Sequence, residues 1–155
     1  MWVASAAAVL LICMLIWKPW AEQDIFKQFA DTQMPVVDER GQPSDSLLKK
    51  VSTAFNEKNY FAAVPVFEQL LKTDSSASTL FYYSIAILQT GNTNKAREEL
   101  QKIYNGNSIY KYDAAFYLAL SYVKDKNNEK AKEWLNRIPS GSPVYEKATQ
   151  LKNKL

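Results

Sequence analysis

Histidine is absent from this chain of 155 residues, and Cys13 is its only cysteine. Without histidine the chain has no Ser–His or Cys–His nucleophile pair, no histidine general base and no histidine metal ligand. A single cysteine excludes an internal disulfide, and Cys13 lies in an apolar run that supplies no further zinc ligands. We therefore expect no metal site, no cofactor and no nucleophilic catalysis.

An excess of one charge sign is also missing. The chain has 19 Lys+Arg against 16 Asp+Glu, a net charge of +3, and its pI is near 8.8. Nucleic-acid-binding domains usually have a pI above ~9 with clustered basic residues, so we expect no nucleic-acid partner. The four glycines are too scattered to form a phosphate-binding loop. General acid–base catalysis needs two carboxylates in contrasting environments, whereas acidic pairs such as Glu98 and Glu99 are adjacent in the chain. We expect a protein that is not an enzyme and has no small-molecule substrate.

One long apolar run opens the chain. Residues 2–17 carry no charge, and the run has Trp2 and Trp17 at its ends, with Lys18 and Trp20 following. Sixteen helical residues span ~24 Å, and snorkelling by Lys18 extends this towards the ~30 Å hydrocarbon core. The pattern predicts a single transmembrane helix over residues 1–20, with tryptophans at the interfaces.

Two other interpretations of this run are weaker. A cleaved signal peptide needs a basic start and a small-residue cleavage site, and neither is evident. A lipoprotein would use Cys13, but Ile12 precedes it where a small residue is expected. By the positive-inside rule, Lys18 alone places the C-terminal side in the cytoplasm.

Residues 21–43 form the predicted linker, which contains Pro35, Gly41 and Pro43. Within it, residues 24–30 can form a short helix with Ile25, Phe26 and Phe29 on one side. From residue 44 onward, apolar residues recur at the helical period and glycines fall only between the periodic stretches. We therefore predict an all-α domain over residues 44–155.

An internal repeat is the clearest signal in this domain. Three alanines, 33 and 35 residues apart, are each preceded four residues earlier by an asparagine suited to cap a helix. A large apolar residue follows each alanine four positions later. The alanines are Ala63, Ala96 and Ala131, the asparagines Asn59, Asn92 and Asn127, and the apolar residues Phe67, Leu100 and Leu135.

With these residues the chain resembles the tetratricopeptide repeat (TPR) family. That family has a small residue where the two helices of a repeat cross, the position that Ala63, Ala96 and Ala131 occupy here. The resemblance implies a right-handed α-solenoid of three TPR-like helix pairs, at about 44–75, 77–108 and 112–139. A C-terminal capping helix over 143–155 is expected to follow.

The whole layout is similar to a group of bacterial envelope proteins that have one membrane helix, a short aromatic linker and a small TPR domain. This resemblance implies a location in the bacterial inner membrane and a soluble domain in the periplasm, the opposite of what Lys18 indicates. It also implies that a cytoplasmic part precedes the membrane helix. We give this likeness more weight than one flanking charge.

The first helix of each TPR pair lines a concave groove. By position, the groove residues expected here are Phe81, Ile85, Gln89, Phe116, Leu120 and Lys124. Because most of them are apolar, the resemblance implies a scaffold that binds a protein partner as a peptide or helix in the groove. The alternative is a groove filled by the chain's own linker, through Ile25, Phe26 and Phe29, with partners on the convex surface or in an oligomer. The sequence leaves the partner and the oligomeric state open.

A basic cluster stands near the C-terminus: Lys124, Lys126, Lys130, Lys132 and Arg137. Residues 76–155 carry 12 Lys+Arg and 7 Asp+Glu, a net charge of +5, which would attract anionic headgroups near a membrane. Acidic residues interleave with these lysines, so we expect mainly a solvated outer face.

Overall fold

The computed structural model of this protein describes residues 24–35 and 43–155. In these two ranges all regular structure is helical, and eight helices pack in sequence as pairs, which confirms the predicted all-α class. None of these eight helices has both the length and the apolar character needed to cross a bilayer. The predicted membrane helix over 1–20 and residues 21–23 and 36–42 of the predicted linker lie outside the described residues.

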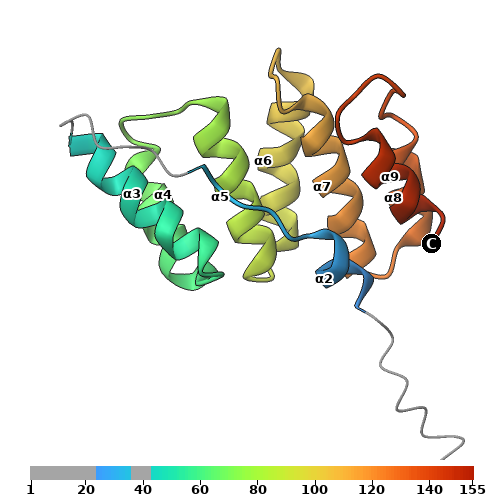
Figure 1. Ribbon diagram of the computed structural model, residues 1–155, viewed down its shortest axis with the longest axis horizontal. Helices are drawn as coiled ribbons and strands as arrows, with labels where there is room; N and C mark the ends of the chain where they lie inside the picture. The colour runs from blue at the N-terminus through green and yellow to red at the C-terminus, as the bar shows by residue number, and fades with distance from the viewer. Residues whose placement is uncertain (1–23, 36–42) are drawn as a thin grey trace, which may run out of the picture.

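Three helix pairs follow one another along the chain (Figure 1). Within a pair, α3 packs against α4, α5 against α6 and α7 against α8, and the second helix of one pair packs against the first helix of the next. The last helix, α9, packs against α8 and against the short α2. The helices are α2 (Ile25–Phe29), α3 (Pro43–Asn56), α4 (Tyr60–Leu70), α5 (Ala77–Gln89), α6 (Thr93–Asn105), α7 (Lys111–Lys124), α8 (Asn128–Leu135) and α9 (Tyr145–Lys152).

The same turn joins the two helices of every pair. A residue with positive φ is followed by an asparagine whose Oδ1 accepts the backbone N–H three residues later, at 3.3, 3.3 and 3.1 Å. This confirms the predicted helix caps, which satisfy backbone donors that the helix itself leaves free. The three turns are Lys58–Asn59, Gly91–Asn92 and Lys126–Asn127, with φ of 60°, 97° and 57° at the first residue.

Small, fully buried residues occupy one repeated position in the second helices. Ala63, Ala96 and Ala131 have no exposed surface. They share one position after the three asparagine caps, and each lies in the second helix of its pair. Because protein interiors are close-packed, a larger side chain at such a position forces its neighbours apart.

Replacing Ala96 with leucine is therefore expected to lower the free energy of unfolding by about 1–3 kcal/mol. Chemical denaturation of the full chain in detergent micelles would measure the change. Ala62→Leu is the matched control, because Ala62 is exposed on α4, and it should change stability little. An unchanged midpoint for Ala96→Leu would argue against tight packing at this position.

Candidate functional site

A segment from the N-terminal end of the described chain lies across the helix pairs (Figure 1). We call residues 24–35 the docked segment. Its short helix α2 packs against α7 and α9, and its remainder reaches α3 at the other end of the array. The side chains of Phe26, Phe29 and Met34 are buried, and so is Ala30. The segment thus occupies a face formed by helices that follow it in the chain, and we call this the docking face.

Local chemistry explains why α2 forms. Asp24 adopts an extended conformation and its side chain accepts the backbone N–H of Lys27 at 3.2 Å, which caps the helix. One helical turn then places Phe26 and Phe29 on the same side, since residues three apart share a helical face. Lys27 and Gln28 remain exposed. The predicted short helix over 24–30 is therefore present, and its apolar side is turned toward α7 and α9.

Specific hydrogen bonds hold the rest of the docked segment. The Asn56 side chain pairs with the backbone of Met34 in both directions: its Oδ1 accepts the Met34 N–H at 2.8 Å and its Nδ2 donates to the Met34 carbonyl at 2.9 Å. The buried Tyr117 hydroxyl donates to the carbonyl of Ala30 at 3.2 Å. Ala30 ends α2 and Met34 lies beyond it, outside any helix, so side chains of α3 and α7 supply the partners for these backbone groups.

Lysines surround the docked segment. Lys58 forms an ion pair with Asp31 at 3.1 Å, and Lys154 donates to the Gln28 side chain at 2.9 Å. The Lys154 ammonium also lies over the Phe29 ring, 5.7 Å from its centroid, and the Lys124 ammonium lies over the Phe26 ring at 4.6 Å. Such cation–π contacts add attraction at the rim of an apolar contact.

The structure places the six predicted groove residues in two different environments. Phe81, Ile85, Phe116 and Leu120 are buried, with exposures of 4%, 0%, 1% and 0%. Gln89 and Lys124 lie at the edge and line a pocket. The four apolar side chains therefore do not offer the apolar lining expected of groove residues, because they are packed in the core; the Phe81 ring, for example, meets the rings of Tyr82 and Tyr117.

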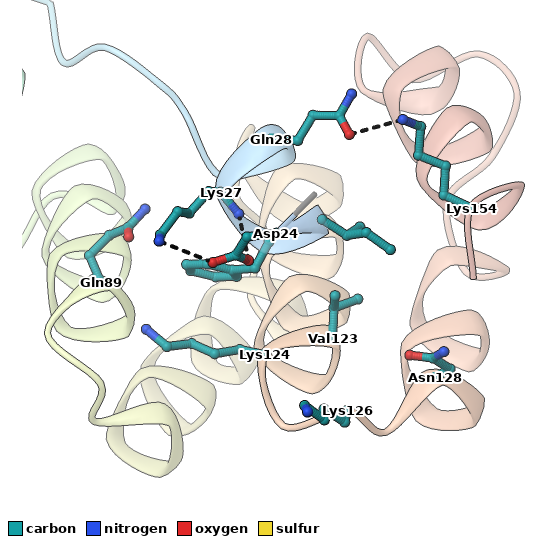
Figure 2. A pocket seen from close by; sticks show the side chains of 11 residues that line it. Asp24, Lys27, Gln28, Gln89, Val123, Lys124, Lys126, Asn128 and Lys154 are labelled. Atoms are coloured by element: carbon teal, nitrogen blue, oxygen red, sulfur yellow. Dashed lines mark hydrogen bonds and ion pairs between the residues drawn. The ribbon is translucent and has the colours of Figure 1, made fainter. Parts of the chain in front are cut away.

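The pocket lies beside the start of the docked segment and has a volume of ≈ 980 Å³ (Figure 2). Its walls come from α2, from the ends of α5 and α7, and from the C-terminal residues of the chain. Four of its lining side chains are lysines and one is acidic: Lys27, Lys124, Lys126, Lys154 and Asp24.

The residues of the predicted basic cluster lie in different surroundings. Lys124 and Lys126 line this pocket, Lys130 lies over the ring of Tyr122, and Arg137 lies over Trp134.

Burial beneath the docked segment changes the acidity of Tyr117. Loss of solvation raises the pKa of its hydroxyl far above the ordinary value, because the phenolate would be buried without a countercharge. Burial likewise raises the pKa of Tyr60, Tyr82 and Tyr83. In the unfolded chain these hydroxyls lose their protons near pH 10, whereas in the folded protein they lose them at higher pH.

The folded protein is therefore expected to lose stability as the pH rises above 10. In that range the unfolded state binds fewer protons than the folded state, so the free energy of unfolding falls with increasing pH. Thermal unfolding of the full chain between pH 8 and pH 11 would measure this. The loss should be smaller in Tyr117→Phe, which has no proton to release at this site. An equal loss in both proteins would show that other groups cause the alkaline effect.

Two features of the described residues bear on metal binding and on proton transfer. No group of three or more Asp, Glu or Cys side chains in residues 24–35 and 43–155 is placed to hold a metal ion. Glu68 accepts a hydrogen bond from the Tyr83 hydroxyl at 2.9 Å and pairs with Lys95 at 3.1 Å, and these contacts lower its pKa. That carboxylate is thus ionised and partnered, rather than held as a proton donor.

Asn56 and Tyr117 are the site residues that the sequence did not reveal. They contact residues 22 and 87 positions away in the chain. Asn56 at the end of α3 and Tyr117 within α7 have no local feature that indicates such a partner. No known protein family, no curated protein and no solved structure matches this chain.

Proposed function

We propose that this chain is a membrane-tethered, non-catalytic scaffold or assembly module of the bacterial envelope, built on TPR-like repeats. In this proposal its groove is filled by its own linker and its partners bind the convex surface or an oligomer contact. The observation that carries the proposal is the docked segment, which buries Phe26, Phe29 and Met34 on the docking face. This occupant leaves little apolar surface there for another ligand.

The repeated turn supports the TPR-like part of the proposal. Three helix pairs share one turn geometry and one fully buried alanine position, as expected for a solenoid in which each repeat packs only on its neighbours. In such a solenoid the docking face corresponds to the concave groove, and α9 corresponds to the capping helix. The right-handed arrangement of the pairs belongs to the same proposal.

The tether supports the self-occupied groove. The docked segment ends at residue 35 and α3 begins at Pro43, so a short connection keeps the segment close to the docking face. Short connections produce effective concentrations in the millimolar range, against which a free peptide must compete. A foreign ligand for this face therefore needs either high affinity or a prior release of the segment.

Partner binding outside the groove can be tested by proximity labelling with the full chain in native membranes. We compare the wild-type protein with Phe26→Ala/Phe29→Ala, which removes the two rings that anchor the docked segment. The proposal predicts the same labelled neighbours for both proteins. New or lost neighbours in the double variant would instead favour a groove that exchanges its own segment for an external peptide with the same apolar spacing.

The proposed topology has a separate test. If residues 1–20 span the inner membrane and the helical domain is periplasmic, a reporter active only in the cytoplasm should be inactive when fused after Leu155. A reporter active only in the periplasm should work at the same position. The reverse pattern would place the domain in the cytoplasm, as Lys18 by itself indicates.

A further inference from the structure

The lysine-lined pocket has features that the scaffold proposal does not use. Four lysines from α2, from the α7–α8 turn region and from the C-terminus line it, although they are up to 127 positions apart in the chain. Asp24 is the one acidic side chain in its lining, and it pairs with Lys27 at 3.4 Å. Asp125, which lies between Lys124 and Lys126 in the chain, pairs with Arg97 of α6 and also attracts the Lys124 ammonium. The lining carries a net charge of +3.

Two of these lysines are held in place by the fold. The Lys124 ammonium donates to the carbonyl of Leu88 at 2.8 Å and lies over the Phe26 ring. Burial lowers its pKa, because the charged form loses solvation there. The Lys154 ammonium is positioned by Gln28. An anion in the pocket would offset the cost of partly burying the Lys124 charge.

The short distance in sequence between the pocket and the predicted membrane helix indicates which anion the pocket would bind. Asp24 lines the pocket and follows Trp20, the last residue of the predicted membrane helix, by four positions. Four extended residues reach at most about 14 Å, since a chain spans at most ~3.6 Å per residue. If residues 1–20 cross the bilayer, the pocket is confined to the layer just above the headgroups of the leaflet on its own side, and an anionic phospholipid there attracts basic side chains within a Debye length.

We propose that this pocket binds the headgroup of an anionic phospholipid and thereby orients the helical domain on the membrane surface. The phosphate would lie among the ammonium groups of Lys124, Lys126 and Lys154. Gln89 and Asn128, which also line the pocket, supply side-chain amides for the polar part of the headgroup. The inference rests on the membrane anchoring in the proposed function. It does not depend on any protein partner of the scaffold.

The test uses the full chain in neutral detergent micelles and three water-soluble probes: dibutyryl-phosphatidylglycerol, dibutyryl-phosphatidylcholine and inorganic phosphate. Titration calorimetry should show saturable binding of the phosphatidylglycerol and much weaker binding of the other two. Lys126→Gln/Lys154→Gln should weaken that binding about 30-fold, since each lysine near an anionic headgroup contributes about 1 kcal/mol and 1.4 kcal/mol is a factor of ten. Both substitutions remove the charge, keep a polar side chain and replace groups that are exposed in the fold.

Lys130→Gln/Lys132→Gln is the matched control. It removes the same charge from α8, whose Lys130 and Lys132 do not line the pocket, and it should bind phosphatidylglycerol like the wild type. Equal weakening in both double variants would mean a general charge effect and would overturn the inference. If inorganic phosphate binds as tightly as the phosphatidylglycerol, the pocket is a site for free phosphate and the inference is wrong. Binding of phosphatidylcholine at the same affinity, or no saturable binding of any probe, would also contradict the headgroup site.

Extraction of native membranes with alkaline carbonate separates this inference from the proposed function. All variants should remain in the membrane fraction if residues 1–20 form the anchor. Release of the wild-type chain by carbonate would contradict the proposed anchoring, whatever the calorimetry shows. Retention without specific phosphatidylglycerol binding would contradict the headgroup site alone.

Discussion

Replacing Phe55 with alanine should lower the free energy of unfolding by about 3–5 kcal/mol, the range for truncating a fully buried aromatic ring. The Phe55 side chain has no exposed surface, and its ring meets three other rings edge to face: Tyr60, Phe67 and Tyr82, at centroid distances of 5.3, 6.3 and 5.4 Å. These contacts join α3, α4 and α5. The substitution therefore leaves a cavity where the first two helix pairs meet, and it removes favourable ring contacts as well.

Phe61→Ala is a closely matched control for this experiment. Phe61 is the same residue type, lies six positions further along the chain, and is 78% exposed at the start of α4. We expect it to change stability by less than about 0.5 kcal/mol, as is usual for exposed positions. Chemical denaturation of both variants in the full chain would measure the difference. Similar effects of the two substitutions would contradict the placement of Phe55 in a shared core.

The second large effect is expected from Phe26→Ala/Phe29→Ala. Burying an aromatic side chain contributes about 1.5–3 kcal/mol, so removing both rings should weaken docking of the segment by about 3–6 kcal/mol. The contacts that remain are the buried Met34 side chain and the hydrogen bonds of Asn56 and Tyr117, together with the exposed ion pair of Lys58 and Asp31, which contributes little. We expect the docked segment to detach while α3–α9 stay folded.

Hydrogen exchange provides the measurement for this second prediction. The Met34 N–H donates to Asn56 only while the segment is docked, so its exchange should become faster by a factor of about 100 or more, following tenfold per 1.4 kcal/mol. Amides in α5 and α6 should keep their protection. Lys27→Ala/Gln28→Ala alters the exposed side of the same helix and should leave the Met34 exchange nearly unchanged.

Either of two results would contradict this account. Unchanged protection of Met34 in the phenylalanine double variant would show that the two rings do not hold the segment. Loss of protection throughout α5 and α6 would show that the segment is part of one cooperative core and not a separable occupant of the docking face. The second result would also remove the basis for a groove that can exchange its ligand.

The sequence by itself determined the helical class, the pairing and the places where helices begin. These features depend on interactions between residues three or four apart, such as the Asn92 cap on Lys95, and on an apolar period that repeats with each helix. The spacing of Ala63, Ala96 and Ala131 likewise indicates a repeat, because a small residue is needed wherever the same tight packing recurs. The short helix at 25–29 was predictable for the same local reason.

Only the tertiary structure decided what covers the docking face. The sequence proposed an external ligand or the chain's own linker, and the choice depends on contacts such as Tyr117 with Ala30, which are 87 positions apart. It also could not tell that Lys27 and Lys154 share a pocket while Lys130 does not. Long-range contacts depend on how several helices pack at once, and local patterns of charge and apolarity do not determine that packing.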